Sequence, residues 1–172
     1  MIVTKEIFED IISDIVMDDN KPINYKFGYW PIIAQELQSE GRSKTLGSAR
    51  YPLIFLNADF DETLIDYRKI RINPTFYIIT QTKSNYNIDD RILNIYKPIL
   101  YEIYRKFMIE IRNSHKFWVF NAEIPHTRKD LFYLQNLSAS QNQINDIVDA
   151  IELRFTSLDL IKSVYDYYDS IL

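Results

Sequence analysis

The acidic side chains of Asp59, Asp61 and Glu62 are the first candidates for chemistry in this sequence, and Phe60 lies among them. They follow the apolar run 51–57. Carboxylates this close together serve acid–base catalysis or the binding of divalent cations. The spacing lacks the regular oxygen ligands and the glycine of an EF-hand loop. A solvated acidic loop is the ordinary interpretation, and an exposed aromatic among charges also suggests contact with a partner protein.

Other catalytic chemistry is restricted by simple counts. The chain has no cysteine, which removes disulfides, thiolate metal sites and thiol nucleophiles. The only histidines, His115 and His126, offer little for zinc or general-base chemistry. Three glycines form neither a GxGxxG motif nor a P-loop, and no G-x-S-x-G elbow supplies a serine nucleophile beside His126. We therefore expect no enzyme activity, no metal and no cofactor, but a structural or binding role.

Basic residues occur in local groups: Arg42 with Lys44, Lys97 with Arg105 and Lys106, and Arg128 with Lys129. Tyr96, Tyr101 and Tyr104 interleave with the middle group, and such interleaving is one way to stack on nucleic-acid bases. However, the net charge is -4 and the pI is about 5.2, without the basic excess of a general nucleic-acid surface. Their helical spacing favours a solvated helix face, with nucleic-acid contact as the lesser alternative.

The 172 residues suit one domain, and 47% hydrophobic with 26% charged residues is ordinary globular usage. Aromatic residues are abundant at 15%. No run of about 18 apolar residues exists, so no membrane location is expected. The first residues turn acidic at once, unlike a signal peptide. These features predict a protein of the cytoplasm.

The elements that must position these residues follow from periodicity. Apolar residues at helical spacing predict helices over 4–18, 31–39 and 87–112. Pro98 either kinks the last helix or divides it in two. Apolar or β-branched runs predict strands over 23–30, 51–57 (a central strand), 69–82, 117–120, 131–134 and 146–156. The remaining segments 39–49, 59–68, 121–130 and 135–145 are expected to be loops or irregular.

The apolar pattern changes phase after Phe155, since Leu158 and Leu160 have the opposite parity. One explanation is a β-bulge near Ser157 that lets a strand continue. The other is a C-terminal helix capped by Ser157. The chain then ends in a tail, residues 162–172, which is either an interface arm or a helix.

The order of helices and strands predicts an α+β fold in which helices pack on one face of a mostly antiparallel sheet. We expect one domain over residues 1–161, followed by the tail. The tail contains Tyr165, Tyr167 and Tyr168. Tyrosines are favoured at protein interfaces, so the tail is a second candidate contact. A frayed or self-packed terminus is the alternative.

Several segments together carry a resemblance to a known group of proteins: YPLIFLNADFDE (51–62), YKPILYEIY (96–104), DAIELRF (149–155) and NYKFGYW (24–30). The pattern resembles small virion proteins at the head–tail junction of tailed bacteriophages. It is most similar to connector ring and tail-terminator-like proteins of crAss-like phages. The resemblance is spread over most of the chain, and its motifs are structural rather than catalytic.

The resemblance implies a tail-terminator-like α+β subunit of a homo-oligomeric ring in the virion, with no catalytic residues. Such a ring surrounds the DNA channel and contacts neighbouring portal, connector or tail proteins. DNA would pass through the lumen without specific binding, which suits an acidic chain. Loops and termini reach neighbouring subunits in this architecture, and the implied interface residues are Asp59, Phe60, Asp61, Glu62, Tyr165, Tyr167 and Tyr168.

Two alternatives belong to other classes. The first is a small metal-dependent nuclease or another soluble phage enzyme that uses Asp59, Asp61 and Glu62. Two-metal chemistry would require these carboxylates to converge with a further acid. The second is an adaptor that binds another protein through Phe60 or through the tyrosines of the tail.

Overall fold

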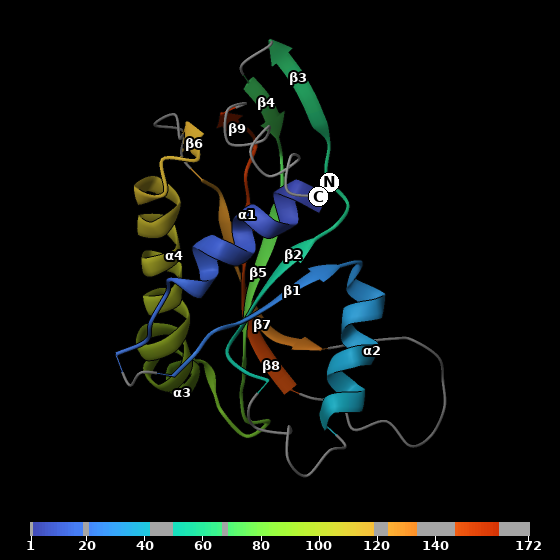
Figure 1. The fold of residues 1–172 in the computed structure, drawn as a ribbon. Helices are drawn as coiled ribbons and strands as arrows, with labels where there is room; N and C mark the ends of the chain where they lie inside the picture. The colour runs from blue at the N-terminus through green and yellow to red at the C-terminus, as the bar shows by residue number, and fades with distance from the viewer. Residues whose placement is uncertain are drawn as a thin grey trace.

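The computed structural model describes residues 2–18, 21–41, 50–66, 69–118, 124–133 and 147–161. Its helical elements are α1 (Ile2–Ser13), α2 (Trp30–Gly41), α3 (Ile88–Arg91), the π-helical η1 (Ile92–Leu100) and α4 (Tyr101–Asn113). The strands are β1 (Asn24–Gly28), β2 (Leu53–Asn57), β3 (Glu62–Asp66), β4 (Lys69–Ile72), β5 (Thr75–Gln81), β6 (Phe117–Trp118), β7 (His126–Tyr133), β8 (Ile147–Arg154) and β9 (Leu158–Ile161) (Figure 1).

The described strands form two sheets. The larger has the order β1-β2-β5-β8-β7, and only β1 and β2 pair in parallel. The smaller is fully antiparallel, with the order β3-β4-β9-β6. The predicted α+β class and mostly antiparallel pairing are confirmed. The prediction that 51–57 contains a central strand is also confirmed, because β2 lies between β1 and β5.

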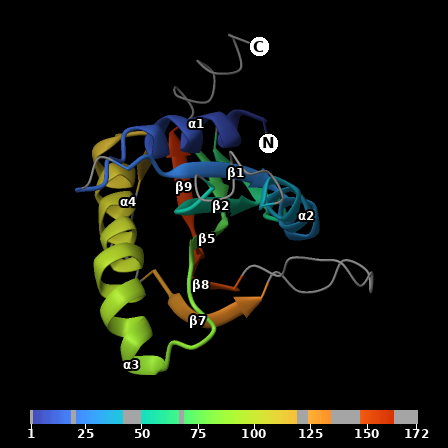
Figure 2. The ribbon, with the colours of Figure 1, turned by 90° about the horizontal axis from the view of Figure 1, so that it is seen from below.

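Helices cover both faces of the larger sheet, not the single face that we expected (Figure 2). On one face, α1, η1 and α4 bury Phe8, Tyr96 and Phe107 against even-numbered residues of β2 and β5. On the other face, α2 packs Ile33, Ala34 and Leu37 on odd-numbered residues of β2. Successive strand residues point to opposite faces. The two-sided apolar pattern of β2 therefore needs two covering layers.

A pair of long strands joins the two sheets. One runs through β4 and β5, and the other through β8 and β9. Thr75 pairs with Arg154, whereas Ile72 pairs with Leu158, so the second strand has one extra residue at the junction. The Phe155 backbone N–H donates to the Pro74 carbonyl at 3.0 Å across this junction. The predicted irregularity near Ser157 is thus confirmed, and 158–161 is strand, not helix.

The long helical segment begins as predicted at Asn87, whose side chain accepts a hydrogen bond from the Asp90 backbone N–H at 2.9 Å. Pro98 lies inside η1. There the backbone N–H of Tyr101 donates to the carbonyl of Tyr96, five residues earlier. Because proline has no N–H to donate, a locally wider π-helical turn accommodates it. The run 88–113 is continuously helical, so the alternative of two helices divided at Pro98 is wrong.

Three boundaries differ from the prediction. The first helix ends at Ser13, yet Ile15 and Met17 remain buried in the following turn, which explains the longer apolar pattern. β3 lies within a segment predicted as a loop, and β7 starts at His126 within a segment predicted as irregular. Both are edge strands of their sheets. Edge strands with solvent-facing side chains lack the alternation on which strand prediction relies.

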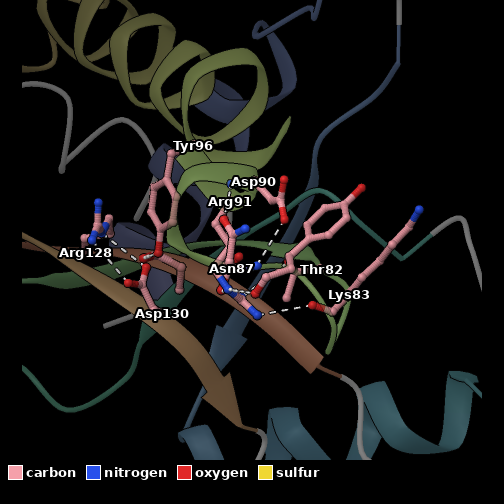
Figure 3. Close-up of polar contacts among 11 residues, drawn as sticks. Thr82, Lys83, Asn87, Asp90, Arg91, Tyr96, Arg128 and Asp130 are labelled. Carbon is pink, nitrogen blue, oxygen red and sulfur yellow. Dashed lines mark hydrogen bonds and ion pairs between the residues drawn. The ribbon is translucent and has the colours of Figure 1, made fainter. Parts of the chain in front are cut away.

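A buried ion pair fastens the start of the long helix to the larger sheet, and Figure 3 shows its arginine, Arg91, with the neighbouring polar side chains. The Arg91 guanidinium lies 2.5 Å from a carboxylate oxygen of Asp149 in β8, and both side chains are almost fully buried. Arg91 also donates to the backbone carbonyls of Tyr86 and Lys83, each at 3.1 Å. Such a pair is costly to break on one side, because the remaining charge stays in a poorly solvated site.

We predict that Asp149→Asn lowers the free energy of unfolding by about 3 kcal/mol, since Arg91 keeps its buried charge without a counter-charge. Urea denaturation followed by circular dichroism measures this change. The matched control is Asp14→Asn, the same substitution at an exposed carboxylate, which should alter stability by less than about 0.5 kcal/mol. Equal stability of the two variants would contradict the role of the pair.

Candidate assembly surface

The smaller sheet forms one end of the molecule, where the hairpin of β3 and β4 extends from the body (Figure 1). β3 is an edge strand and, among the described strands, pairs only with β4. Every residue over 61–65 is exposed. We call residues 61–65 the β3 edge. Both faces of this strand meet solvent, which is unusual for a strand with apolar residues.

The β3 edge carries two large apolar side chains that the described residues leave exposed. Leu64 is 66% exposed and Ile65 is 44% exposed. Natural proteins usually protect edge strands with charges, bulges or covering segments, since an open apolar edge invites pairing with another chain. β3 includes the charged residues Glu62 and Asp66 and has an irregular register after Leu64, yet its two large apolar side chains remain exposed. Adjacent exposed apolar residues on a projecting edge therefore mark a contact surface.

The predicted acidic interface residues lie at the base of this hairpin. Asp61 accepts a hydrogen bond from the side-chain amide of Asn73 at 3.2 Å, and its backbone N–H donates to Asn73 at 2.7 Å. Glu62 accepts one from the Thr4 hydroxyl at 2.9 Å. Asp59 is exposed, but Phe60 is half-buried against the main core. The expectation that Phe60 is exposed was therefore wrong, and the exposed large apolar side chains of this hairpin are Leu64 and Ile65.

These carboxylates do not gather into one cluster. Asp61 is turned toward the β4–β5 junction through Asn73, and Glu62 toward α1 through Thr4. Within the described ranges, no three histidine or acidic side chains lie close enough together to hold a metal ion. The contacts at Asp61 and Glu62 brace the hairpin against the body of the protein.

A second arginine–aspartate pair holds the hairpin strand β4 on β9. The Arg71 guanidinium donates two hydrogen bonds to the Asp159 carboxylate, at 2.7 and 3.0 Å. The Asp159 side chain is only 2% exposed. The hydrogen bonds and the charge of Arg71 hold the pKa of Asp159 below its ordinary value. A bidentate pair of this kind fixes orientation as well as distance.

A pocket of about 410 Å³ lies at the opposite edge of the smaller sheet, and its described lining is Arg112, His115, Phe117, Trp118 and Ile161. We call it the Trp118 pocket. Trp118 is 53% exposed, and the ammonium group of Lys69 lies 4.9 Å from the centre of its ring. His115, which follows the C-cap residue Ser114 of α4, has a φ of 53°. This left-handed residue ends the helix and turns the chain into β6.

The sequence predicted a short strand at 117–120 but gave no reason to single out this pocket. Its residues come from the end of α4, from β6 and from the end of β9. These segments meet through the pairing of β6 with β9 and through the hydrogen bond from the Ile161 backbone N–H to the Lys116 carbonyl at 3.1 Å. The one sequence feature that could have indicated this site is the occurrence of a histidine, a lysine and a tryptophan within residues 115–118.

Three of the basic residues singled out by spacing, Lys106, Arg128 and Lys129, form ion pairs within the chain. Lys106 forms ion pairs with Asp18 at 2.7 Å and with Glu102 at 2.8 Å. Arg128 pairs with Asp130 at 3.2 Å and its guanidinium lies over the ring of Tyr96 at 5.1 Å. Tyr96 is fully buried, which removes it as a platform for a base.

His126 is exposed, as expected, but it lies in β7 with its ring 5.1 Å from that of Tyr104. In the same region Lys129 pairs with the buried Glu152 at 3.1 Å. Several sequence predictions fall outside the described residues: the basic pair Arg42 and Lys44, most of the loop 39–49, the loop 135–145, and Tyr165, Tyr167 and Tyr168 in the tail.

Comparisons of the chain with protein-family models, with curated proteins and with solved structures find no match. In the ranges that the structure describes, no helix is long and apolar enough to cross a membrane. The fold and the two surfaces of the smaller sheet are therefore the basis for a functional proposal.

We predict that Arg71→Met reduces the loss of stability that the wild type shows when the pH is lowered. A carboxylate whose pKa is lowered by folding stabilises the protein above its unfolded pKa, and this contribution is lost as the pH falls through the folded pKa. The difference in urea midpoint between the wild type and Arg71→Met should therefore be large at pH 7. This difference in midpoint should become smaller when the pH falls below 3.8, the ordinary pKa of an aspartate.

The matched control is Arg105→Met, which removes an exposed arginine on α4. The urea midpoint of this control should differ little from that of the wild type at pH 7 and at pH 3. A difference for Arg71→Met that stays constant from pH 7 to pH 3 would show that Asp159 is not the titrating partner.

Proposed function

We propose that this protein is a structural virion subunit that forms an oligomeric ring at the head–tail junction of a tailed bacteriophage. The proposal combines the resemblance of segments 24–30, 51–62, 96–104 and 149–155 with the α+β fold. The single observation that carries it is the projecting β3 edge, whose Leu64 and Ile65 are exposed without cover from the body. In this proposal, the protein acts through shape and contacts, not through catalysis.

The energetics of the β3 edge favour association. Complete burial of one leucine or isoleucine side chain is worth about 1.5–3 kcal/mol, so two such residues form the centre of a useful contact. Acidic residues flank them, and charged rims around an apolar centre are typical of protein interfaces. Because the edge projects, a neighbouring subunit can reach it without a change in the body.

The overall charge is consistent with a conduit for DNA. A net charge of -4 gives the subunit no general attraction to phosphates, so DNA would slide through a ring of such subunits without specific binding. The proposed partners are other copies of this chain and the portal, connector or tail proteins above and below the ring. The proposed location is the virion, after assembly in the host cytoplasm.

We predict that Leu64→Lys abolishes the ring, because a charge replaces an apolar side chain at the centre of the contact. Native mass spectrometry and electron microscopy compare the wild type, as a closed oligomer, with the variant, as a monomer. Leu93→Lys is the matched control, since Leu93 is 62% exposed on η1, outside the hairpin. It should leave the oligomer intact. Both substitutions are at exposed sites and should change stability by less than about 0.5 kcal/mol.

A wild-type protein that is strictly monomeric and absent from purified phage particles would overturn the proposal. Assembly that occurs only on a preformed partner ring would still support it, because the protein would then be found in the particles. Equal loss of assembly in the Leu64 and Leu93 variants would remove the special role of the β3 edge.

The tail provides a separate test of the predicted interface residues Tyr165, Tyr167 and Tyr168. We predict that deletion of residues 162–172 weakens association between rings or subunits, because tyrosines supply large contact areas at small entropic cost. Sedimentation velocity of the truncated and complete chains measures the change. A matched variant with these three tyrosines changed to serine keeps the chain length. Unchanged assembly in both would exclude the tail from the interface.

A further inference from the structure

We propose that the β3 edge of one subunit docks into the Trp118 pocket of the next subunit. This inference rests on the proposed ring function and identifies the two surfaces that meet. The occupant of the pocket is a second copy of this chain, represented by Leu64 and Ile65 and the acidic residues that precede them. The pocket contributes Arg112, His115 and Trp118.

The positions of the two surfaces suit a head-to-tail contact. The smaller sheet has the order β3-β4-β9-β6, so the β3 edge and the Trp118 pocket lie at opposite edges of one sheet. A two-fold dimer brings the same patch of both partners together, whereas a ring requires two different patches on each subunit. Two surfaces at opposite edges of a sheet meet that requirement directly.

The apolar chemistry of the two surfaces is complementary. The β3 edge offers two exposed branched aliphatic side chains. The pocket offers the exposed ring of Trp118 and the side chain of Ile161, and the buried Phe117 belongs to its lining. Its volume of about 410 Å³ falls within the roughly 300–1,000 Å³ of sites that bury ligand groups. Trp118 is half-exposed in the single chain, and burial of a tryptophan in a pocket is typical of an interface hot spot.

The charges are complementary as well. Asp59 and Asp61 are exposed beside β3, and the described side-chain partner of Asp61 is the uncharged amide of Asn73. The pocket side carries the guanidinium of Arg112, and the ammonium group of Lys69 lies against Trp118. Opposite charges around an apolar centre fix the orientation of a contact and suppress wrong pairings.

A complementation experiment tests the contact in the complete chain. The hairpin variant carries Leu64→Lys and Ile65→Lys and keeps its pocket. The pocket variant carries Arg112→Glu and Trp118→Ser and keeps its hairpin. Each variant alone should be monomeric, with association at least about 30-fold weaker than the wild type, the fold-change expected when an interface hot spot is lost. An equimolar mixture should form a 1:1 dimer, because one intact hairpin meets one intact pocket.

A charge exchange separates a direct contact from a general effect on folding. Asp59→Lys and Arg112→Glu should each weaken association, and the chain that carries both should recover most of it. Native mass spectrometry measures all three, and melting temperatures confirm that each variant is folded. Failure of the double variant to recover, or absence of the 1:1 dimer while the wild type forms rings, would overturn the inference but leave the proposed function standing.

Other occupants of the pocket give different results, each of which overturns the inference. If the pocket takes the tail, complementation will be lost in chains truncated after residue 161. If it takes nucleic acid, a labelled single-stranded oligonucleotide will bind the wild type and not the pocket variant, while the pocket variant still assembles. If hairpins pair with hairpins, the pocket variant alone will associate. A monomeric wild type that is absent from particles would instead remove the proposed function.

Discussion

One extra residue at the junction of the two sheets is the constraint on which the rest of the assembly surface depends. Residues 155–157 of one strand face only residues 73 and 74 of its partner. Because strand side chains alternate between faces, Leu158 and Leu160 would turn to solvent without this offset. With it, they join Leu153 in the main core. β4 and β9 then carry β3 and β6 on their outer edges, so both proposed contact surfaces follow from a single irregularity in the register.

The sequence predicted those elements whose side chains are buried in a regular pattern. The apolar spacing located the three main helical segments, and the two-sided apolar run at 53–56 located the central strand. The same run contained the reason for helices on both faces, since Leu53 and Phe55 need a covering layer different from that of Ile54 and Leu56. Periodicity defines an apolar stripe on a helix but does not say which face of the sheet it will cover. The placement of α2 therefore required the structure.

The β3 edge and the Trp118 pocket could not be predicted from the sequence, for a related reason. β3 has solvent on both faces, so its residues carry no signature of burial. The Trp118 pocket combines residues as distant as Arg112 and Ile161, which become neighbours only when β6 pairs with β9. The acidic segment 59–62 was recognised from its composition, and the structure places it at the base of the hairpin. Its role in the single chain is structural, through Thr4 and Asn73, while the exposed apolar residues follow directly after it.

The two arginine–aspartate pairs stabilise different parts of the molecule. Arg91 and Asp149 fix the long helix to the larger sheet, whereas Arg71 and Asp159 fix β4 to β9 between the proposed surfaces. In a head-to-tail ring, the angle between successive subunits equals the rotation that relates the two surfaces within one subunit. Here that rotation is set by the right-handed twist of a small sheet from β3 to β6. A bidentate ion pair across its central strands resists change in that twist. The geometry of this sheet therefore contributes to the number of subunits in the proposed ring.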